Sequence, residues 1–359
     1  MNLPLYEQGA QSINKLNLNS SDINLGLYYQ KFCKSWKGKF DDLDKKEFIN
    51  EIAGKSQRLN RDLLDEHTER MCRLTCELDG RFKIYELTER FLTGIGLDHP
   101  VEVGFLWDYT LGVPYIAGSS IKGIVKDWVK NWCQEANEDI IRIFGSDDNK
   151  ENQVGSVIFF DALPYGMINL ATDIITPHYS PYYSQEECPG DWTNPTPIPF
   201  LTVDKNQKFI FYIAPRTQKY VKDCLKAIDW LEAALTTLGA GAKTATGYGR
   251  FTQSEEAENA YYKELKSKIE EEKRKRKLEN MSPIQKEMEQ DGYSTDSDIF
   301  MENLTVKWLK RLEDDGDDLI KKEIAKHLAK WYKANKSKQW KKPKGKNIEK
   351  VNLIKSFLD

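Results

Sequence analysis

The segment LGVPYIAGSSIKGIVKDWVKNWCQE, residues 111–135, sets the pattern for the middle of this chain. An extended stretch ends at Gly118, and Ser119 and Ser120 are good residues for a helix N-cap. Apolar residues then recur at helical spacing over the rest of the segment. We therefore predict an extended run that turns into a helix. The first turn of that helix would offer backbone N–H groups and the positive end of the helix dipole.

Strand and helix patterns alternate on both sides of this segment. Extended runs are predicted from Phe82 to Gly96, in 155–164 and, as a hairpin with Phe209, Phe211 and Ile213 facing inward, in 200–216. An amphipathic helix, 220–238, then leads through the glycine-rich loop 239–249 into a last strand. The order strand, helix, strands, helix, strand predicts an α+β, ferredoxin-like sheet of the RNA-recognition type, with helices on one face.

Three regions are predicted along the chain, with limits 1–80, 81–253 and 254–359. The first is helical and is expected to be a lid or a docking surface. Its apolar residues fall near one face in two groups: Leu27, Tyr28, Phe32 and Trp36, and then Leu59, Leu63, Met71, Leu74 and Leu78. The second is the α+β domain. The third begins with a charged helix that has no continuous apolar face, continues as a small helical bundle and ends in a lysine-rich tail.

Composition excludes several classes of protein. The 359 residues carry 53 Lys and Arg against 56 Asp and Glu, so an indiscriminate polyanion binder of the histone type is excluded. A hydrophobic content of 40% excludes global disorder. No apolar run approaches the roughly 18–20 residues of a membrane span, and the N-terminus lacks a signal-peptide pattern. Six sparse cysteines favour the reducing cytoplasm.

The loop GAGAKTATGYGRF, residues 239–251, invites comparison with a phosphate-binding P-loop, but Ala242 replaces the second glycine. The loop also follows a helix and enters a strand, which is the reverse of the P-loop order. Glycines such as Gly241 let a ligand approach the backbone and leave N–H groups free for an anion. Side chains with a charge, a hydroxyl or a stacking ring accompany them: Lys243, Thr244, Tyr248 and Arg250. The loop therefore suits an RNA backbone, or else is a tight helix–strand connection with an incidental lysine.

Several motifs in order carry a family resemblance. PYIAGSSIKGIVKDW, upstream of FGS, and GAGAKTATGYGRF resemble the paired signatures of the RAMP superfamily of CRISPR proteins. With TGIGLDHPVEVGF, GSVIFFDALP and DIITPHYSPYY, the set is most similar to the family of sixth subunits of type III-B Cmr effector complexes. The match covers roughly Phe82 to Phe251. The family often has proline where this chain has Ala117.

The resemblance implies a non-catalytic structural subunit that binds guide RNA (crRNA) at the head of a ribonucleoprotein in antiviral defence. Its partners would be the crRNA, the RAMP backbone subunits, a neighbouring head subunit and, indirectly, target RNA, with no membrane and no cofactor. By position, Ser119, Ser120 and Lys122 would touch guide phosphates. Lys243, Thr244 and Tyr248 would contact or support the same strand.

A catalytic alternative rests on Asp98 and His99, in the loop after the first strand. An Asp–His pair can bind a divalent ion or act as a general base, and backbone RAMP subunits carry a metal-binding aspartate in a comparable loop. The chain would then be a metal-dependent endoribonuclease. The alternative is that these residues shape the loop, with Glu102 as a further partner. Since no second carboxylate cluster is evident, we favour the structural role and predict no metal site.

Three smaller questions concern cysteine, histidine and the tail. Cys72 and Cys76, four residues apart with His67 nearby, are expected to be buried thiols rather than zinc ligands. His178 is expected in a loop or an interface, and His327 on a helix surface. The aromatic residues of the tail are Trp331, Tyr332 and Trp340. They would either stack on bases or pack in a helix core, and a solvated or partner-facing helix is favoured for the tail.

Overall fold

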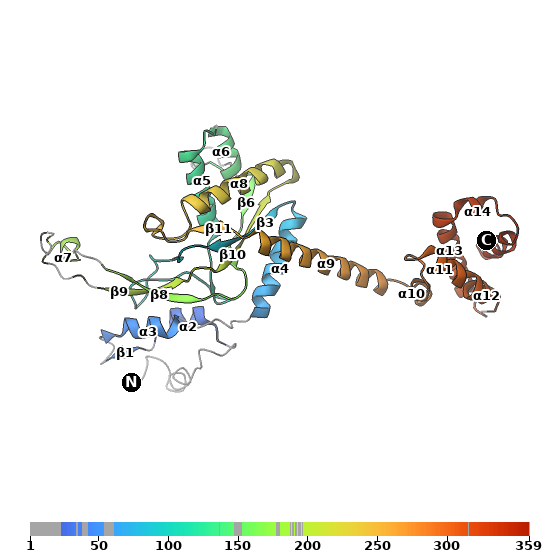
Figure 1. Cartoon of the computed structure of the whole chain (residues 1–359), viewed down its shortest axis with the longest axis horizontal. Coiled ribbons are helices and arrows are strands. Elements are labelled where there is room, and N and C mark those ends of the chain that lie inside the picture. The colour runs from blue at the N-terminus through green and yellow to red at the C-terminus, as the bar shows by residue number, and fades with distance from the viewer. Residues whose placement is uncertain are drawn as a thin grey trace. The chain divides into compact units, whose positions relative to one another are not determined.

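The computed structural model describes residues 23–359 except 34, 38–41, 54–60, 136, 147–152, 177–179, 187, 189, 191, 193–194, 196, 315 and 359. The chain divides into two compact units, Met1–Tyr262 and Lys263–Asp359 (Figure 1). The three limits drawn from the sequence do not coincide with this division, and they remain a proposal for the domain boundaries. Each unit is described separately below.

The first unit is built on one antiparallel sheet (Figure 1). Its strands, in spatial order, are β11 (Phe251–Gln253), β3 (Arg81–Leu87), β10 (Lys208–Pro215) and β6 (Val157–Phe159), and β7 (Leu163–Pro164) also pairs with β10. Helix α5 (Gly118–Trp132) joins β3 to β6, and α8 (Val221–Thr237) joins β10 to β11. Numbered along the chain, the four main strands lie in the order 4-1-3-2. This confirms the predicted ferredoxin-like fold.

One face of the sheet packs against α5 and α8. Phe209 and Phe211 of β10 lie with their rings 6.0 and 5.7 Å from that of Phe251 on β11, edge to face. Inward residues of α5, such as Val125 and Val129, are fully buried in the same core. The predicted inward alternation along β10 is therefore confirmed.

The opposite face of the sheet is also covered, so the expectation of helices on one face was wrong. Helix α4 (Arg61–Glu77) contacts β3 and β10. The ring of Phe82 on β3 lies 5.9 Å from that of Tyr261 in the first turns of α9 (Glu255–Glu279). Tyr212 on this face is 1% exposed. An RNA-recognition domain that stacks bases on a free sheet face is therefore not present here.

The buried face of α4 differs from the predicted one. Leu63 and Leu74 are 41% and 42% exposed, whereas Leu64 and Cys72 are buried, together with Thr68 and Thr75. Small side chains on the inner face let the helix approach the aromatic surface of the sheet closely, which a leucine-rich face would not. Leu59 lies outside the described residues.

The predicted hairpin in 200–216 was also wrong in its pairing. Strand β9 (Ile198–Val203) pairs with β8 (Leu170–Ile175), not with β10. Because β10 already has a neighbour at each edge, no free edge remains for β9. The short helix α7 (Ser180–Tyr183) lies between β8 and β9 along the chain. A second small ribbon pairs β4 (Trp107–Asp108) with β5 (Val113–Pro114).

The described part of the N-terminal region packs into the core of the first unit. It comprises α2 (Leu25–Lys31), the ribbon β1–β2 (Trp36–Lys37 and Asp42–Leu43), α3 (Lys45–Ile52) and α4. Tyr29 is fully buried, and its hydroxyl donates a 3.0 Å hydrogen bond to the Val103 carbonyl. This region is thus part of the domain rather than a detached lid. Helix α6 (Asn137–Phe144) follows α5 and contacts it.

The second unit is the predicted helical bundle. After α9 it contains α10 (Pro283–Gln290), α11 (Ser297–Asn303), a π-helical turn (Leu304–Trp308), α12 (Leu309–Asp314), α13 (Asp318–Asn335), α14 (Ser337–Lys341) and α15 (Asn347–Ser356). Three tail aromatics pack in its core: Trp331 and Tyr332 are 1% and 0% exposed, and Trp340 is 9% exposed. The helix-core alternative is therefore the one that the structure supports.

An ion pair between the half-exposed Arg142 and the buried Asp223 ties α6 to α8 in the first unit. Arg142 donates to both carboxylate oxygens of Asp223 at 3.0 Å, and the Ser156 hydroxyl donates to the same carboxylate at 2.7 Å. Burial acts to raise the pKa of the Asp223 carboxyl, but the hydrogen bonds from Arg142 and Ser156 outweigh it and hold this pKa below its usual value.

We expect Asp223→Ala to lower the free energy of unfolding by about 2 kcal/mol at pH 7, because Ser156 loses its acceptor and Arg142 keeps only Asp139. The pKa of the Asp223 carboxyl is lower in the folded protein than its ordinary value of 3.8, so the ionised carboxylate stabilises the folded state at pH values above 3.8. This stabilisation is lost as the pH falls through the lower pKa of the folded state. The difference in the free energy of unfolding between wild type and variant should therefore be constant from pH 7 to 5 and shrink below about pH 4. Urea unfolding across this range measures it.

The matched control is Asp229→Ala, an exposed position on the same helix. A gap that stays constant into the acid range, or one of the same size in the control, would contradict this account of Asp223.

Candidate nucleic-acid interface

Helix α5 begins at Gly118, one residue before the serines that were expected to cap it. Ala117 is the N-cap, and the Gly118 N–H donates a 2.6 Å hydrogen bond to Oδ1 of Asp161, which follows β6. A Cβ at Gly118 would lie 2.3 Å from the Phe159 carbonyl oxygen, so only glycine allows this approach. The N-cap prediction for Ser119 and Ser120 was therefore wrong, because a carboxylate distant in sequence supplies the cap.

This cap changes how the first turn of α5 can bind an anion. The Asp161 carboxylate already interacts with the positive end of the helix dipole and occupies the first N–H group. Ser119 and Ser120 remain exposed in the first turn, and Lys122 follows as a half-exposed side chain. Lys122 forms no ion pair within the described part of the chain. A phosphate here would be bound by hydroxyls and an ammonium group.

The glycine-rich loop is pinned to the segment that follows β3. The Ala242 N–H donates to the Leu92 carbonyl at 2.7 Å, and the Gly249 N–H donates to the Arg90 carbonyl at 2.7 Å. Gly241 has φ +85°, and a Cβ there would lie 2.3 Å from the Leu92 oxygen. The loop is thus a rigid turn, and these two amides are not available to a phosphate.

Lys243 lies at the corner of this turn. Its φ is +56°, and its carbonyl accepts hydrogen bonds from the N–H and the hydroxyl of Thr246 at 3.0 and 2.9 Å. The lysine side chain is half-exposed and, among the described residues, has no acidic partner. The Thr244 carbonyl accepts from the Arg250 guanidinium at 3.3 Å. Thr244 and Arg250 therefore shape the loop from which the Lys243 ammonium extends.

Tyr248 has partners inside the protein. Its hydroxyl donates a 2.7 Å hydrogen bond to Asp173 of β8, and its ring centroid lies 6.3 Å from that of Phe200 on β9. Burial, together with the hydrogen bond to Asp173, raises the pKa of Tyr248 to about 12. The hydroxyl is therefore engaged at every physiological pH, and the half-buried ring joins the glycine loop to the β8–β9 ribbon.

Asp173 is the residue that sequence reasoning missed. It also accepts a 2.9 Å hydrogen bond from Arg90. Burial acts to raise its pKa, but the bonds from Tyr248 and Arg90 hold the carboxyl pKa below its usual value. Asp173 opens the quoted motif DIITPHYSPYY, so its position was visible in the sequence although its partner was not. A cleft of about 570 Å³ borders this cluster, lined in part by Arg90, Asp173, Lys205 and Tyr248.

The fold places the two turns at opposite edges of the sheet. The glycine loop leads into β11 and is bonded to residues 90 and 92, so it lies beyond the end of β3. The α5 turn lies against Phe159 at the end of β6. Phe159 pairs with Ile213, which pairs with Arg81 at the start of β3, so the α5 turn is also displaced along the strands from the glycine loop. Three strand spacings separate the two edges, about 14 Å, and the displacement along the strands adds to this distance. Lys122 and Lys243 are therefore suited to phosphates several nucleotides apart, not to one phosphate.

The geometry around His99 argues against a catalytic pair. The ring stacks on Tyr29 with centroids 4.2 Å apart; Nε2 lies 2.8 Å from the Tyr29 carbonyl, and Nδ1 accepts from the Val101 N–H at 3.2 Å. Burial lowers the pKa of His99, so the neutral ring is favoured. Asp98 is exposed, and Glu102 pairs with Lys45. Both ring nitrogens are engaged, which leaves none for a metal or for proton abstraction.

The other cysteine and histidine residues singled out in the sequence have structural surroundings where they are described. Cys72 is buried against the sheet, where burial raises its thiol pKa, while His67 contacts Arg70 at 3.1 Å. The described residues contain no group of three or more His, Cys, Asp or Glu side chains placed to hold a metal ion. His327 is half-buried, with Nε2 2.7 Å from the Gln285 amide nitrogen, so the surface assignment was wrong. His178 lies outside the described residues.

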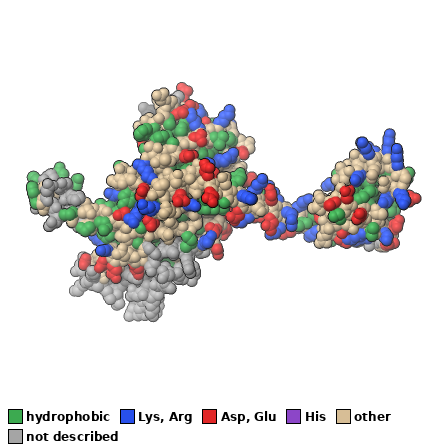
Figure 2. Space-filling model, in the orientation of Figure 1, with side chains coloured by type: hydrophobic (Ala, Val, Ile, Leu, Met, Phe, Trp, Pro, Cys, Tyr) green, Lys and Arg blue, Asp and Glu red, His purple; other side chains and the backbone are tan. Residues whose placement is uncertain are grey.

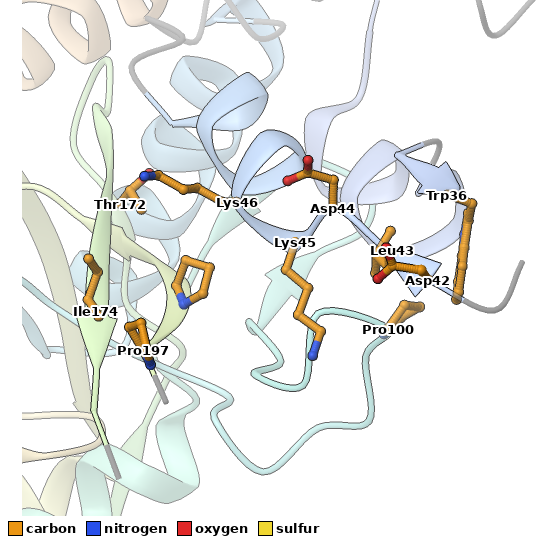
Figure 3. Close-up of a pocket in the computed structure, with 11 residues that line it drawn as sticks. Trp36, Asp42, Leu43, Asp44, Lys45, Lys46, Pro100, Thr172, Ile174 and Pro197 are labelled. Atoms are coloured by element: carbon orange, nitrogen blue, oxygen red, sulfur yellow. The ribbon is translucent and has the colours of Figure 1, made fainter. Parts of the chain in front are cut away.

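A second cleft, of about 600 Å³, lies between α3 and the β8–β9 ribbon. Figure 3 shows Lys46 reaching toward Thr172 and Lys45 turned toward the loop that carries Pro100. Asp42 and Asp44 line the same cleft, so its two lysines are offset by two carboxylates. This balance gives a polyanion no net attraction, and we do not include the cleft in the candidate interface.

Comparison with known proteins gives consistent matches. The RAMP superfamily model matches residues 84–252. The chain is 30% identical to the CRISPR system Cmr subunit Cmr6 of Pyrococcus furiosus, over 49% of this chain and 68% of that protein. It is 26% identical to the CRISPR system CMR subunit Cmr6 of Saccharolobus solfataricus, over 64% of this chain and 79% of that protein.

Two solved structures of Cmr proteins are similar to this chain. One is the cryo-EM structure of the Type III-B Cmr-beta bound to cognate target RNA, with a TM-score of 0.47 and 22% identity over 69% of this chain and 86% of the matched chain. Another is the crystal structure of Cmr6 from Pyrococcus furiosus, with a TM-score of 0.33 and 26% identity over 49% of this chain and 98% of that chain. Within the described residues, no helix is both long enough and apolar enough to cross a membrane.

We expect Gly241→Ala to destabilise the glycine loop by about 2 kcal/mol or more, because it adds a Cβ against the Leu92 carbonyl to the cost of a positive φ. Gly247→Ala is the matched control: its φ is +99°, but a Cβ there meets nothing within 4 Å. We expect the control to cost only about 1 kcal/mol. Thermal unfolding compares the two, and equal losses would mean that the loop is not held against residues 90–92.

Proposed function

The chain belongs to the Cmr6 family of the RAMP superfamily, and from this premise we propose that it is a non-catalytic, crRNA-binding structural subunit at the head of a type III-B Cmr complex. Its neighbours would be the RAMP backbone subunits and an adjacent head subunit, and it would meet target RNA only indirectly. The observation that carries the proposal is the placement of Lys122 and Lys243 on two rigid turns, one at each edge of the sheet. Both ammonium groups are free of ion pairs within the described residues.

Binding at these two turns is expected to be directed at the sugar-phosphate backbone. Ser119, Ser120 and Lys122 supply hydroxyl donors and one charge, and Lys243 supplies a second charge. Gly241, Thr244, Tyr248 and Arg250 hold the loop in shape, as their contacts indicate. Because no base-reading surface is needed for such contacts, the guide sequence would matter little to this subunit.

A cytoplasmic location fits this assignment. All six cysteines are free thiols, which suits a reducing compartment. The family comparisons place the relatives of the chain in CRISPR systems, and we propose that this chain acts in the same kind of defence system.

We expect the double change Lys122→Ala, Lys243→Ala to weaken guide binding and to make it less sensitive to salt. Loss of two phosphate contacts lowers the slope of log affinity against log salt by about 1.4 for a single strand. The test measures guide binding to the reconstituted complex over roughly a tenfold range of salt, from about 0.05 to about 0.5 M, and compares the slopes.

The matched control is Lys219→Ala, Lys222→Ala, two exposed lysines at the start of α8, at the end of the sheet away from the glycine loop. This pair should leave the slope unchanged. If the Lys122 and Lys243 pair also leaves it unchanged, the proposed interface is wrong.

The endoribonuclease alternative has its own test. We expect the complex with Asp98→Ala to cut labelled complementary RNA in the presence of Mg²⁺ at the same positions and rates as wild type, because His99 is engaged on both nitrogens. Gel analysis of the products measures this, with a complex lacking guide as the control. Loss of one specific cut in the variant would overturn the non-catalytic assignment.

A further inference from the structure

The second unit separates its charges along the chain. Residues 283–318 contain 11 acidic residues against 4 basic ones, whereas residues 319–359 contain 13 lysines against 3 acidic residues. Helix α9 differs from both, since it mixes 8 acidic with 8 basic side chains. The charge of -3 for the whole chain therefore conceals one strongly basic part of the bundle.

The densest part of this charge, here named the lysine segment, is residues 336–346. It contains no acidic residue and six lysines: Lys336, Lys338, Lys341, Lys342, Lys344 and Lys346. It runs from the end of α13 through α14 to the start of α15. All of these lysines except the half-exposed Lys336 are exposed, and Figure 2 shows blue side chains projecting from the surface of this unit.

One aromatic side chain fixes the backbone of the lysine segment. Trp340 is 9% exposed, and its ring lies 5.8 Å from that of Tyr332 on α13. The ammonium groups of Lys333 and Lys355 lie 5.8 and 5.3 Å from its centroid. Because Trp340 points into the core, the lysines on either side of it in sequence are left on the outer surface.

The charge of the lysine segment is not neutralised within the unit. None of its six lysines has an ion pair with a described residue. By contrast, Lys307 on the acidic side of the bundle pairs with Glu287 and Asp291 at 2.9 and 2.7 Å. An uncompensated group of this density attracts a polyanion.

The chemistry of the lysine segment favours a nucleic acid over an acidic protein. Protein interfaces are depleted in lysine and rely on buried aromatic or arginine anchors. The segment contains no arginine, and its one aromatic ring is already used in the core. Exposed lysines without base-reading partners match the evenly spaced phosphates of a polynucleotide.

We propose that the lysine segment is a second nucleic-acid-binding surface, which holds the sugar-phosphate backbone without reading base sequence. This surface belongs to the second unit, whereas the α5 turn and the glycine loop belong to the first. It lies outside residues 84–252, which the RAMP model matches. Its binding energy is electrostatic, so RNA and DNA strands of the same length are held alike.

The test uses the full chain carrying Lys122→Ala and Lys243→Ala, so that the first candidate surface is already disabled. To this chain we add K338Q, K341Q, K342Q and K344Q. The probes are labelled single strands of RNA and DNA of one mixed sequence unrelated to any guide, and fluorescence anisotropy gives their affinity at several salt concentrations. The four changes should lower the salt slope by about 3 and the affinity by on the order of tenfold or more near physiological salt.

The matched control makes the same charge change on α9, with K263Q, K266Q, K268Q and K273Q, where acidic neighbours alternate with the lysines. The proposal expects this control to bind like its parent. An equal loss in the control, or no loss in the lysine-segment variant, would overturn the proposal. Failure of the parent chain to bind either strand would overturn it too and would favour an acidic protein partner. Because the two tests change different lysines, Lys122 and Lys243 in one and the lysine segment in the other, the two proposals fail separately.

Discussion

The position of β10 at the centre of the sheet is the constraint on which the first unit depends. Residues Phe209 to Pro215 are all buried, and the strand has neighbours at both edges. A strand of this kind needs helices on both faces, because its side chains alternate between them. This requirement brings α4 and the start of α9 onto the face that an RNA-recognition domain leaves open. It also sends β9 away to pair with β8.

The same constraint locates the candidate interface. With both sheet faces covered by helices, the proposed RNA contacts cannot use the sheet surface itself, and we assign them to turns at its edges. The two lysine-bearing turns lie at opposite edges of the sheet, and each is held through its backbone N–H groups rather than by its own side chains. Rigid turns of this kind fix the backbone positions of the two lysines, although the lysine side chains remain free to change rotamer. The fold therefore sets where the two charges lie, and the charges supply the attraction for phosphate.

Features set by local pattern could be predicted from the sequence, and features set by distant partners could not. The amphipathic helix after Gly118 and the glycine loop follow from spacing alone, and with the element order they were enough for the ferredoxin-like fold. The Asp161 cap joins residues 43 positions apart, and the Tyr248–Asp173 bond joins residues 75 apart. No periodicity reports such contacts. The buried face of α4 was missed for a related reason, since leucine spacing ignores the need for small side chains against an aromatic sheet.

The carboxylate at the start of α5 limits what kind of RNA contact this turn can make. A helix N-terminus attracts phosphate when its first amides are free, but here Asp161 takes the Gly118 amide and adds a negative charge beside it. A bound phosphate would therefore lie off the helix axis, toward the hydroxyls of Ser119 and Ser120 and toward Lys122. Ala117 fits this arrangement: its φ of −62° is the value that a proline ring would impose, so the family proline can be absent without moving the turn. The cap thus makes the turn rigid, and it leaves the attraction for phosphate to Lys122.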